Sequence, residues 1–256
     1  MVASLMYSKN SAKEVQEDYL KSIPTPEKTE TYSPLPHWDF LFNALHLGLE
    51  ILSPHGYSAG DSRIIVSKDD QKMFFTQNWN HPNDDGLNLS GGGRNSLDKS
   101  MSAAYGLGGR IAICDNMMMW SDVCVFRKHT GDVFEHLRKN LILTFHTARD
   151  TWRDMNKEKE LFQSRDCDIP SGDHFLCSAL ESKALNDKQF KVALDNWRTP
   201  PYEEFSRRDV WGAYNAGTEG LKRCRYSKTL ESHKRFHDFT REHFKFDQTA
   251  VKVLTK

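Results

Sequence analysis

A glycine-rich stretch that runs into polar residues is the first place where the sequence suggests chemistry. The run GGGRNSLDKS predicts a loop followed by a helix over residues 95–106, with Asn95 or Ser96 as the cap. The free backbone amides at such a helix start bind anions, because the positive end of the helix dipole lies there. Arg94 and Lys99 would add charged contacts to a phosphate. The spacing matches neither a P-loop nor a dinucleotide fingerprint, so a flexible loop before an ordinary capped helix is the competing and commoner interpretation.

Polar side chains also follow two predicted strands, over residues 109–116 and 121–128. If the two strands pair, these side chains converge at one edge of a sheet and combine a carboxylate, cations and an imidazole. Such groups serve acid–base and phosphate chemistry, and Asp115 and His129 are the candidate catalytic residues. The competing interpretation is structural, with a turn after the first strand and a helix cap after the second. The residues concerned are Asp115, Asn116, Arg127, Lys128, His129 and Thr130.

A basic and aromatic segment nearer the C-terminus predicts a different site. Residues 207–224 are expected to form a helix, and cations are interleaved there with aromatic side chains. Cations contact the phosphates of single-stranded nucleic acid, and aromatic rings stack on its bases. A solvated basic surface is the commoner outcome of such a pattern. The cations are Arg207, Arg208, Lys222, Arg223, Arg225 and Lys228, and the aromatic residues are Trp211, Tyr214 and Tyr226.

Neither the histidines nor the cysteines predict a metal site. His233 and His237 lie four residues apart on an expected helix, and His129 and His136 lie seven apart, but no third ligand accompanies either pair. A solvated helix face is therefore the expectation for His233 and His237. The five cysteines form no close pair, which indicates reduced and mostly buried thiols rather than disulfides or a zinc site. No cofactor is expected.

The composition is that of a folded globular protein without a strong electrostatic field. Of the 256 residues, 38% are hydrophobic and 27% are charged, and the 35 basic residues balance the 35 acidic ones. Net charge therefore does not draw the chain to nucleic acid or to an anionic membrane, and such binding needs a local patch. No apolar run is long enough to span a bilayer, and the first residues lack the core of a secretion signal. A cytoplasmic location without membrane contact is the expectation.

The chain is expected to hold one domain behind an arm. Residues 1–35 are predicted to be an extended or flexible N-terminal arm, because a proline-rich run at their end lacks the amides for regular hydrogen bonds. Residues 36–256 are predicted to form a single α+β domain. Strand patterns come before helical ones, so we expect a mostly antiparallel sheet in the N-terminal half, packed by helices on one face, and a helix-rich C-terminal half. The other expected elements are a helix over 37–51, strands over 62–68 and 71–79, a loop over 80–93, and helices over 131–162, 171–183, 186–197 and 228–244.

Four segments, in their order along the chain, resemble a known family. They are TPEKTETYSPLPHWDF, GGGRNSLDKS, GRIAICDN with FRKHT, and RRDVWGAYNAGTEGLK, and the likeness runs from about Pro24 to His243. The family is the phage and plasmid-like group known as domain of unknown function 932. The resemblance implies a mobile-element origin and a setting in the host cytoplasm, and it carries over no reaction and no catalytic residue. The matching polar positions include Arg94, Asn95, Ser96, Asp98, Lys99, Cys114, Asp115, Asn116, Arg127, His129, Thr130, Trp211, Asn215, Thr218 and Glu219.

Three functions fit these features, and whether the chain is an enzyme stays open. The first in rank is a phage or mobile-element accessory protein that binds nucleic acid, such as a single-strand DNA binding or annealing factor that assembles into oligomers. The second is an enzyme that holds a phosphate-bearing substrate with Arg94 and Lys99. The third is a protein-binding inhibitor of a host defence system, because the methionines of residues 117–120 would make an adaptable contact surface. The candidate partners are single-stranded nucleic acid, a host protein and a second copy of the chain.

Overall fold

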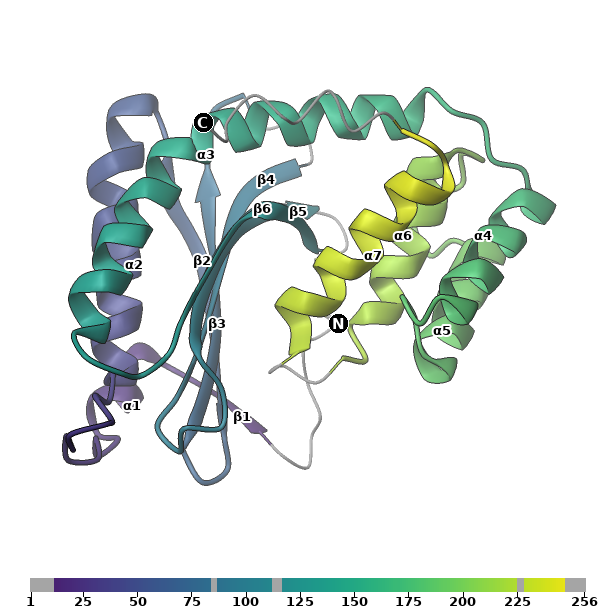
Figure 1. Cartoon of the computed structure of the whole chain (residues 1–256). Coiled ribbons are helices and arrows are strands. Elements are labelled where there is room, and N and C mark those ends of the chain that lie inside the picture. The colour runs from purple at the N-terminus through teal and green to yellow at the C-terminus, as the bar shows by residue number, and fades with distance from the viewer. Residues whose placement is uncertain (1–11, 84–86, 112–116, 225–227, 247–256) are drawn as a thin grey trace.

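Antiparallel strands form one sheet in the N-terminal half of the chain (Figure 1). The computed structural model describes residues 12–83, 87–111, 117–224 and 228–246. Within these residues the sheet has six strands, and each strand pairs with its neighbours in sequence. Helices make up most of the remainder, so the expected α+β class with a helix-rich C-terminal half is confirmed. The strands are β1 (Ala12–Val15), β2 (Ser58–Ser67), β3 (Lys72–Asn80), β4 (Leu87–Ser96), β5 (Ala103–Ile111) and β6 (Met117–Arg127).

The helices begin at capping residues that the sequence supplies. Asp132 accepts a hydrogen bond from the amide of Glu135 at 3.2 Å where α3 begins, and Asn186 forms a capping box with Gln189 where α5 begins. The long helix and the shorter helices predicted after it are confirmed, with their ends shifted by a few residues. The helices are α1 (Glu17–Lys21), α2 (His37–Leu52), α3 (Val133–Gln163), α4 (Ile169–Glu181), α5 (Asp187–Arg198), α6 (Val210–Leu221) and α7 (Thr229–His243).

α3 is a long helix that joins the two halves of the molecule. Its 31 residues run first beside α2 and then toward α6 and α7, and the helix changes direction on the way (Figure 1). The hydroxyl of Thr147 donates to the carbonyl of Thr144 at 2.8 Å, and that of Thr151 donates to the carbonyl of Thr147 at 2.9 Å. Hydrogen bonds of this kind to the preceding turn bend helices. Among the described helices, none combines the length and the apolar character needed to cross a bilayer.

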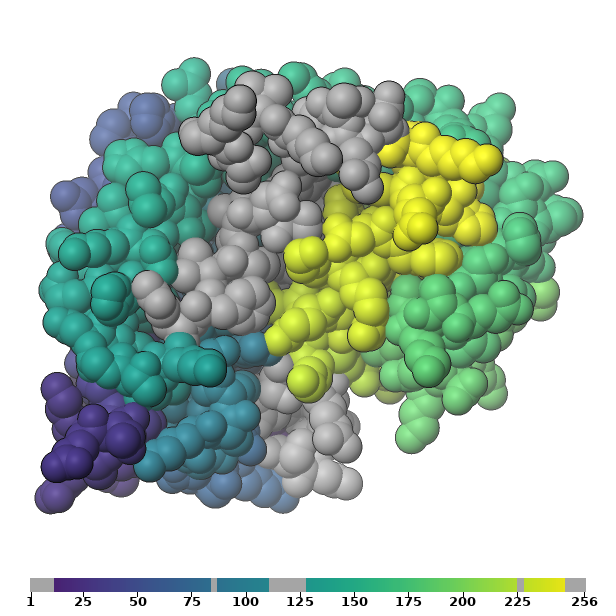
Figure 2. Space-filling view, viewed as in Figure 1, coloured from purple at the N-terminus to yellow at the C-terminus, as the bar shows by residue number. Residues whose placement is uncertain are grey.

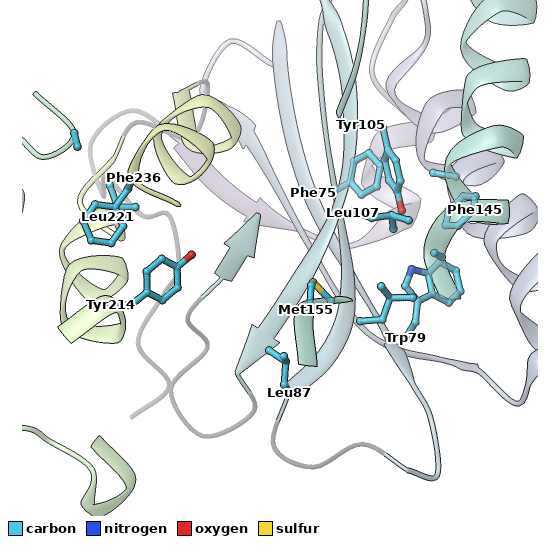
Figure 3. Close-up of a cluster of buried hydrophobic side chains, with 14 of the residues drawn as sticks. Phe75, Trp79, Leu87, Tyr105, Leu107, Phe145, Met155, Tyr214, Leu221 and Phe236 are labelled. Carbon is cyan, nitrogen blue, oxygen red and sulfur yellow. The ribbon is translucent and has the colours of Figure 1, made fainter. Parts of the chain in front are cut away.

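Aromatic rings on one face of the sheet pack against α2 and α3 (Figure 3). Phe75 of β3 meets Phe40 of α2 with ring centroids 5.3 Å apart, and Trp79 meets Phe145 of α3 at 5.7 Å. Tyr105 of β5 packs on the same Phe145 at 5.5 Å. All five side chains are buried. Removing these rings from water is therefore a main source of the stability of this layer.

The opposite face of the sheet also carries helices, so the expectation that helices cover one face only is wrong. Figure 1 places α4 to α7 on that side, and Figure 2 shows the surface of α7 adjoining that of the other C-terminal helices. Leu230 of α7 lies beside Gly92 of β4, 3.6 Å from the position that a Cβ would take there. Arg94 of β4 forms an ion pair with Glu231 of α7. The sheet is therefore packed from both sides.

The N-terminal arm lies on the domain from residue 12 onward. β1 pairs with β2 in antiparallel register, and Leu20, Tyr32 and Leu35 are buried. The hydroxyl of Tyr32 donates to the carbonyl of Leu97 at 2.7 Å, which fixes the arm to the turn between β4 and β5. The described part of the arm is therefore held against the sheet by backbone pairing and by apolar burial.

His37, the first residue of α2, ties the arm to two turns of the sheet. Its Nε2 donates to the carbonyl of Asp70 at 3.2 Å, and its Nδ1 accepts from the side-chain amide of Asn95 at 3.0 Å. The same amide of Asn95 donates to the carbonyl of Leu35 at 2.7 Å. These partners require a neutral imidazole, and burial lowers the pKa of His37 to about 4.

The predictions of a loop through residue 93 and of a helix over residues 95–106 are wrong. β4 runs through the glycines of this segment, and β5 begins where the helix was expected to continue. A Cβ on Gly93 would lie 2.3 Å from the ring of Phe75, so the glycine makes room for a ring on the next strand. Glycine inside a strand often marks such a close approach. The anion site that the sequence predicts at a helix start therefore has no helix start.

We expect Gly93→Ala to destabilise the protein by about 1–3 kcal/mol, because the buried ring of Phe75 cannot move away from the new methyl group. Gly92→Ala is the matched control on the opposite face of the same strand. The atom nearest to its Cβ position is 3.5 Å away. Its effect should stay within about 1 kcal/mol. Urea denaturation measures both variants, and equal stabilities would contradict the packing described.

The free energy of unfolding should fall as the pH drops from about 7 to 5. The folded protein keeps His37 neutral, whereas the unfolded chain protonates this residue near pH 6.5. With a folded pKa of about 4, the loss at pH 5 is about 2 kcal/mol for His37 alone. Burial also lowers the pKa values of His129 and His237, which adds to the same trend.

His37→Gln removes this titration and should make the dependence of stability on pH shallower. Urea denaturation at pH 7.5 and at pH 5 measures the free energy of unfolding of both proteins. A difference between the two pH values that is the same in the variant as in the wild type would rule out His37 as a source of the trend.

Candidate functional site

Three of the predicted site residues meet at one end of the sheet. Lys99 lies in the turn between β4 and β5, and Lys128 and His129 follow β6. A cavity of about 570 Å³ opens between them and the N-terminal arm. The ammonium of Lys99 lies 4.5 Å from the ring centre of Tyr32, whose ring is 5.9 Å from that of His129. We call this cavity the sheet-end pocket, and Tyr32, Lys99, Ser100, Lys128, His129 and Thr130 are among the residues that line it.

Arg94, Asn95 and Ser96 do not line this pocket. They form the end of β4 and are buried. Arg94 pairs with Glu231 of α7, and the hydroxyl of Ser96 bonds to the carbonyl and the amide of Met101 at 2.8 and 3.2 Å. The side-chain amide of Asn95 donates to the ring of His37 and to the carbonyl of Leu35. The three residues therefore join neighbouring segments of backbone and do not form the anion site predicted from the sequence.

The predicted stacking surface on α6 is not formed, because Trp211 and Tyr214 are buried. Tyr214 stacks on Phe236 of α7 with ring centroids 5.6 Å apart. Core packing thus uses the rings that were expected to stack on bases. Three of the flanking cations also have partners within the chain: Arg207 pairs with Asp209 at 3.2 Å, Arg208 lies 4.6 Å from the ring centre of Trp197, and Lys222 pairs with Glu219 at 2.6 Å.

Arg223 lines a separate pocket of about 730 Å³ between α5, α6 and α7. Lys183, Lys228 and Arg235 line it as well, and Asp187 is the one carboxylate among its described lining residues. The pocket is therefore basic, but it lies apart from the sheet-end pocket. Lys99 of the glycine segment thus meets the residues after β6, whereas Arg223 and Lys228 of the late basic segment lie at a different pocket.

Some predicted residues fall outside the parts of the chain that the structure describes. Asp115 and Asn116 do so, as do Arg225 and Tyr226, and of Arg127 only the backbone is described, at the end of β6. The condition for the expected convergence of Asp115 with His129 is not met, because β5 and β6 are antiparallel: Arg110 at the end of β5 lies opposite Met117 at the start of β6, and Arg127 at the end of β6 lies opposite Ala103 at the start of β5. A catalytic role for either residue stays a prediction.

His233 and His237 are buried, so the expectation of a solvated helix face is wrong. The Nε2 atom of His237 lies 3.5 Å from the carboxylate of Glu158, which also accepts a hydrogen bond from Arg241 at 2.7 Å. Burial lowers the pKa of His237. The network joins α3 to α7. Among the described residues, no three His, Cys, Asp or Glu side chains form a cluster that could hold a metal ion.

A further cavity is one that the sequence did not predict. This cleft of about 870 Å³ opens where the C-terminal end of α2, the ends of β2 and β3, and the middle of α3 come together. The residues that meet there are far apart in the sequence. We call it the α2–α3 cleft, and His55, Tyr57, His81, Arg149, Trp152 and Arg153 are among its lining residues.

Aromatic rings form part of the wall of the α2–α3 cleft. His81, just after β3, contacts Tyr57 and Trp152 with ring centroids 4.8 and 5.9 Å away. The Nδ1 atom of His81 accepts from the backbone amide of Asn83 at 3.1 Å, which assigns the proton of the neutral ring to Nε2. The indole Nε1 of Trp152 is buried and has no hydrogen-bond partner among the described residues. A planar ligand in the cleft would therefore find ring faces.

Two arginines, a histidine and the carboxylate of Asp150 lie on the α3 wall of the same cleft. His146, Arg149 and Arg153 recur at helical spacing and lie on one face of α3. Arg153 pairs with Asp150 at 3.2 Å and with Asp154 at 3.4 Å. Arg149 is exposed and makes no ion pair with a described residue. The guanidinium of Arg149 is therefore available to an anion.

A second pocket of about 390 Å³ continues this cleft along α2 and α3. The two cavities share Ile51, Pro54, His55 and His146, and the second one adds the guanidinium of Arg138. A signal for this groove was present in the sequence, because cations recur on one face of the long helix. The apolar spacing of the same residues predicts the helix but does not show which element faces its cations. The positions on the groove side are Arg138, Ile142, His146, Arg149 and Arg153.

Comparisons with known proteins leave the function to be argued from this geometry. No protein-family model, curated protein or solved structure matches the chain. The resemblance to the phage and plasmid-like family stays a prediction, since it depends on the order of four sequence segments. The two features that carry a functional argument are the α2–α3 cleft and the sheet-end pocket.

Proposed function

We propose that the protein binds single-stranded nucleic acid along the α2–α3 cleft. The observation that carries the proposal is the presence of aromatic rings and guanidinium groups in one open cleft. Proteins that bind single strands combine these two features, because rings stack on bases while cations track the phosphates. His81 and Trp152 supply the rings, and Arg149 supplies a cation without an ion pair to a described residue. This is the class of function expected from the sequence, assigned to different residues.

The dimensions of the groove fit a strand of more than one nucleotide. The cleft alone, at about 870 Å³, lies within the range of small-ligand sites. Its continuation extends the row of cations from Arg153 back to Arg138, which is roughly 22 Å along the helix axis at 1.5 Å per residue. A single strand that follows α3 would pass all three guanidinium groups. The neutral net charge of the chain is compatible with this, because the cations are gathered locally.

The proposal also includes a biological role, which is supported by observations other than the cleft. An accessory role in a phage or another mobile element depends on the family resemblance alone. An annealing role would further require that the protein binds strands without strong sequence preference, which stacking on the rings of His81 and Trp152 allows.

The proposal predicts binding of a fluorescently labelled oligothymidylate that weakens as salt is added. With three guanidinium groups on the phosphates, the slope of log K against log salt should be about −2. Arg149→Glu should weaken binding about tenfold or more and make the slope shallower. Trp152→Leu should weaken binding by about 1–3 kcal/mol, because a stacking partner is lost, and should leave the slope unchanged. Fluorescence anisotropy measures all three proteins.

Lys139→Glu is the matched control for this experiment. It makes the same change of charge on the same helix, at an exposed position next to Arg138 that does not line the groove. We expect it to bind nearly as well as the wild type. The proposal fails if no binding is seen at low salt, or if Lys139→Glu and Arg149→Glu weaken binding equally.

A second candidate function is binding to another protein, which an exposed apolar stripe on α2 favours. Phe42 and Leu49 are 47% and 39% exposed, and Phe42 contacts the rings of Trp38 and His46 at 5.6 and 5.7 Å. The four residues recur at helical spacing on one side of the helix. Such patches mark contact sites more often than chance when they are contiguous. The sequence also suggests the methionines of residues 117–120 for this role, but their side chains lie outside the described parts.

If this stripe joins two copies of the chain, the protein should form dimers or larger assemblies as its concentration rises. The double variant Phe42→Ser, Leu49→Ser should stay monomeric under the same conditions, as measured by light scattering after size-exclusion chromatography. Leu143→Ser, which removes a 65% exposed leucine from α3, is the control and should associate like the wild type. A wild-type protein that is monomeric throughout would exclude self-association, and a pull-down from host lysate would then test a host protein.

A further inference from the structure

The sheet-end pocket has a lining chemistry that differs from that of the α2–α3 cleft. Its described lining residues include the amines of Lys99 and Lys128, the imidazole of His129, and the hydroxyl groups of several serines and threonines. None of these lining residues is a carboxylate. Amines and hydroxyls that converge without a counter-ion match the oxygen atoms of a small anion. The hydroxyl groups belong to Thr31, Ser100, Ser102 and Thr130.

His129 gives an independent sign that a polar ligand fits this pocket. The residue is only 6% exposed, and neither of its ring nitrogens has a partner at full hydrogen-bond geometry among the described residues, although the nearby backbone of Ser33 partly offsets the lowering of its pKa by burial. Buried polar groups are nearly always hydrogen-bonded, so an imidazole with two unmatched nitrogens needs an explanation. Its backbone is well held, since the carbonyl of His129 accepts from the amide of Ser33 at 3.0 Å. The ring itself contacts that of Tyr32, another residue that lines the pocket, with centroids 5.9 Å apart.

Lys99 occupies a strained backbone conformation at the mouth of the pocket. Its φ angle is +64°, in the left-handed region that favours glycine or asparagine. Such strain is concentrated at sites where a side chain has a function. The adjacent Asp98 does not neutralise the lysine, because its carboxylate bonds to the amide of Ser100 at 3.0 Å and pairs with Lys72 at 3.2 Å. Lys128 makes no ion pair with a described residue.

From these observations we infer that the sheet-end pocket binds a phosphomonoester group, with Lys99 and Lys128 pairing with its charges and the hydroxyl groups donating to its oxygens. The site is separate from the α2–α3 cleft. The cleft lies just after Asn80, where β3 ends. The sheet-end pocket lies just after Ser96, where β4 ends, and Ser96 pairs with Lys72 at the start of β3. The two sites are therefore at opposite ends of this strand pair. Neither site requires the other. The phosphate belongs either to a small phosphorylated molecule or to the 5′ end of a nucleic acid strand.

The first test titrates inorganic phosphate into the whole protein at low ionic strength by isothermal titration calorimetry. We expect saturable binding that Lys99→Gly and Lys128→Ala each weaken at least fivefold. Lys99→Gly is informative because glycine suits a φ of +64°, so the melting temperature should stay the same or rise while binding is lost. A folding defect therefore cannot explain the loss.

Lys245→Gly is the matched control, because Lys245 has a φ of +53° and does not line the pocket. It should bind phosphate like the wild type. The absence of phosphate binding, or equal affinities for the wild type and Lys99→Gly, would overturn the inference. Weakening of the same size in Lys245→Gly would overturn it as well.

The second test identifies the source of the phosphate and separates this site from the cleft. It uses the Arg149→Glu protein, in which the cleft is impaired, with a nucleoside 5′-monophosphate and with oligonucleotides that carry a 5′-phosphate or a 5′-hydroxyl group. A preference for the 5′-phosphorylated strand that Lys99→Gly abolishes identifies a strand end. Equal binding of the monophosphate and the phosphorylated strand identifies a small phosphorylated ligand. Equal binding of both strands, with no effect of Lys99→Gly, contradicts the site.

Discussion

The packing of aromatic rings directly onto glycine backbone is the constraint on which the rest of the structure depends. A Cβ on Gly48 of α2 would lie 2.3 Å from the ring of Trp79, so the helix approaches β3 at a distance that no other residue permits. The same relation joins Gly217 of α6 to Phe236 of α7, where the distance would be 2.0 Å. Because interiors are close-packed, a single added methyl group at these contacts must displace a ring and its neighbours. The distance between α2 and the sheet, and hence the width of the α2–α3 cleft, follows from these contacts.

α3 turns this local packing into an arrangement of the whole molecule. Its first half contributes Phe145 to the layer beside α2, and its second half contributes Glu158 to the buried network with Arg241 and His237. Burying the carboxylate of Glu158 is costly, and the hydrogen bond from Arg241 at 2.7 Å offsets that cost. The bend between the halves also exposes the cationic side of α3 to the cleft. One helix therefore sets the positions of the C-terminal helices and the charge of the candidate site.

The sequence predicted the elements whose signal is local and missed those whose cause is distant. The apolar spacing of α2 and α3 and the β-branched run of β2 identify their elements without further knowledge. β4 was missed because its glycines resemble a loop, and the reason for two of them lies on neighbouring strands: the ring of Tyr105 fills the space beside Gly91, and that of Phe75 fills the space beside Gly93. The roles of Trp211 and Tyr214 were misjudged for a similar reason, since α6 is enclosed by other helices and its rings serve the core.

The candidate sites show the same division between local and distant causes. Lys128 and His129 follow a strand, as the sequence predicts, but Lys99 was expected on a helix and meets them for a reason that the sequence does not show. β4 and β6 are each antiparallel to β5, so the residues after these two strands lie at the same end of the sheet. The α2–α3 cleft was not foreseen. Tyr57, His81 and Trp152 come from three elements, and their spacing along the chain carries no sign that they touch. Only the cations of α3 recur with a period that points to a common face.

The sequential pairing of the strands has a consequence for how the chain reaches its native state. From β2 to β6, every strand pairs with the next one along the chain, so this part of the sheet can assemble by closing short loops, each at a small entropic cost. α2 and α3 bracket β2 to β6 in sequence and cover one face as soon as α3 has formed. The opposite face is covered only when α7, which begins at Thr229, has formed. During synthesis on the ribosome, one face of the sheet therefore stays open to solvent until the residues of α7 have emerged.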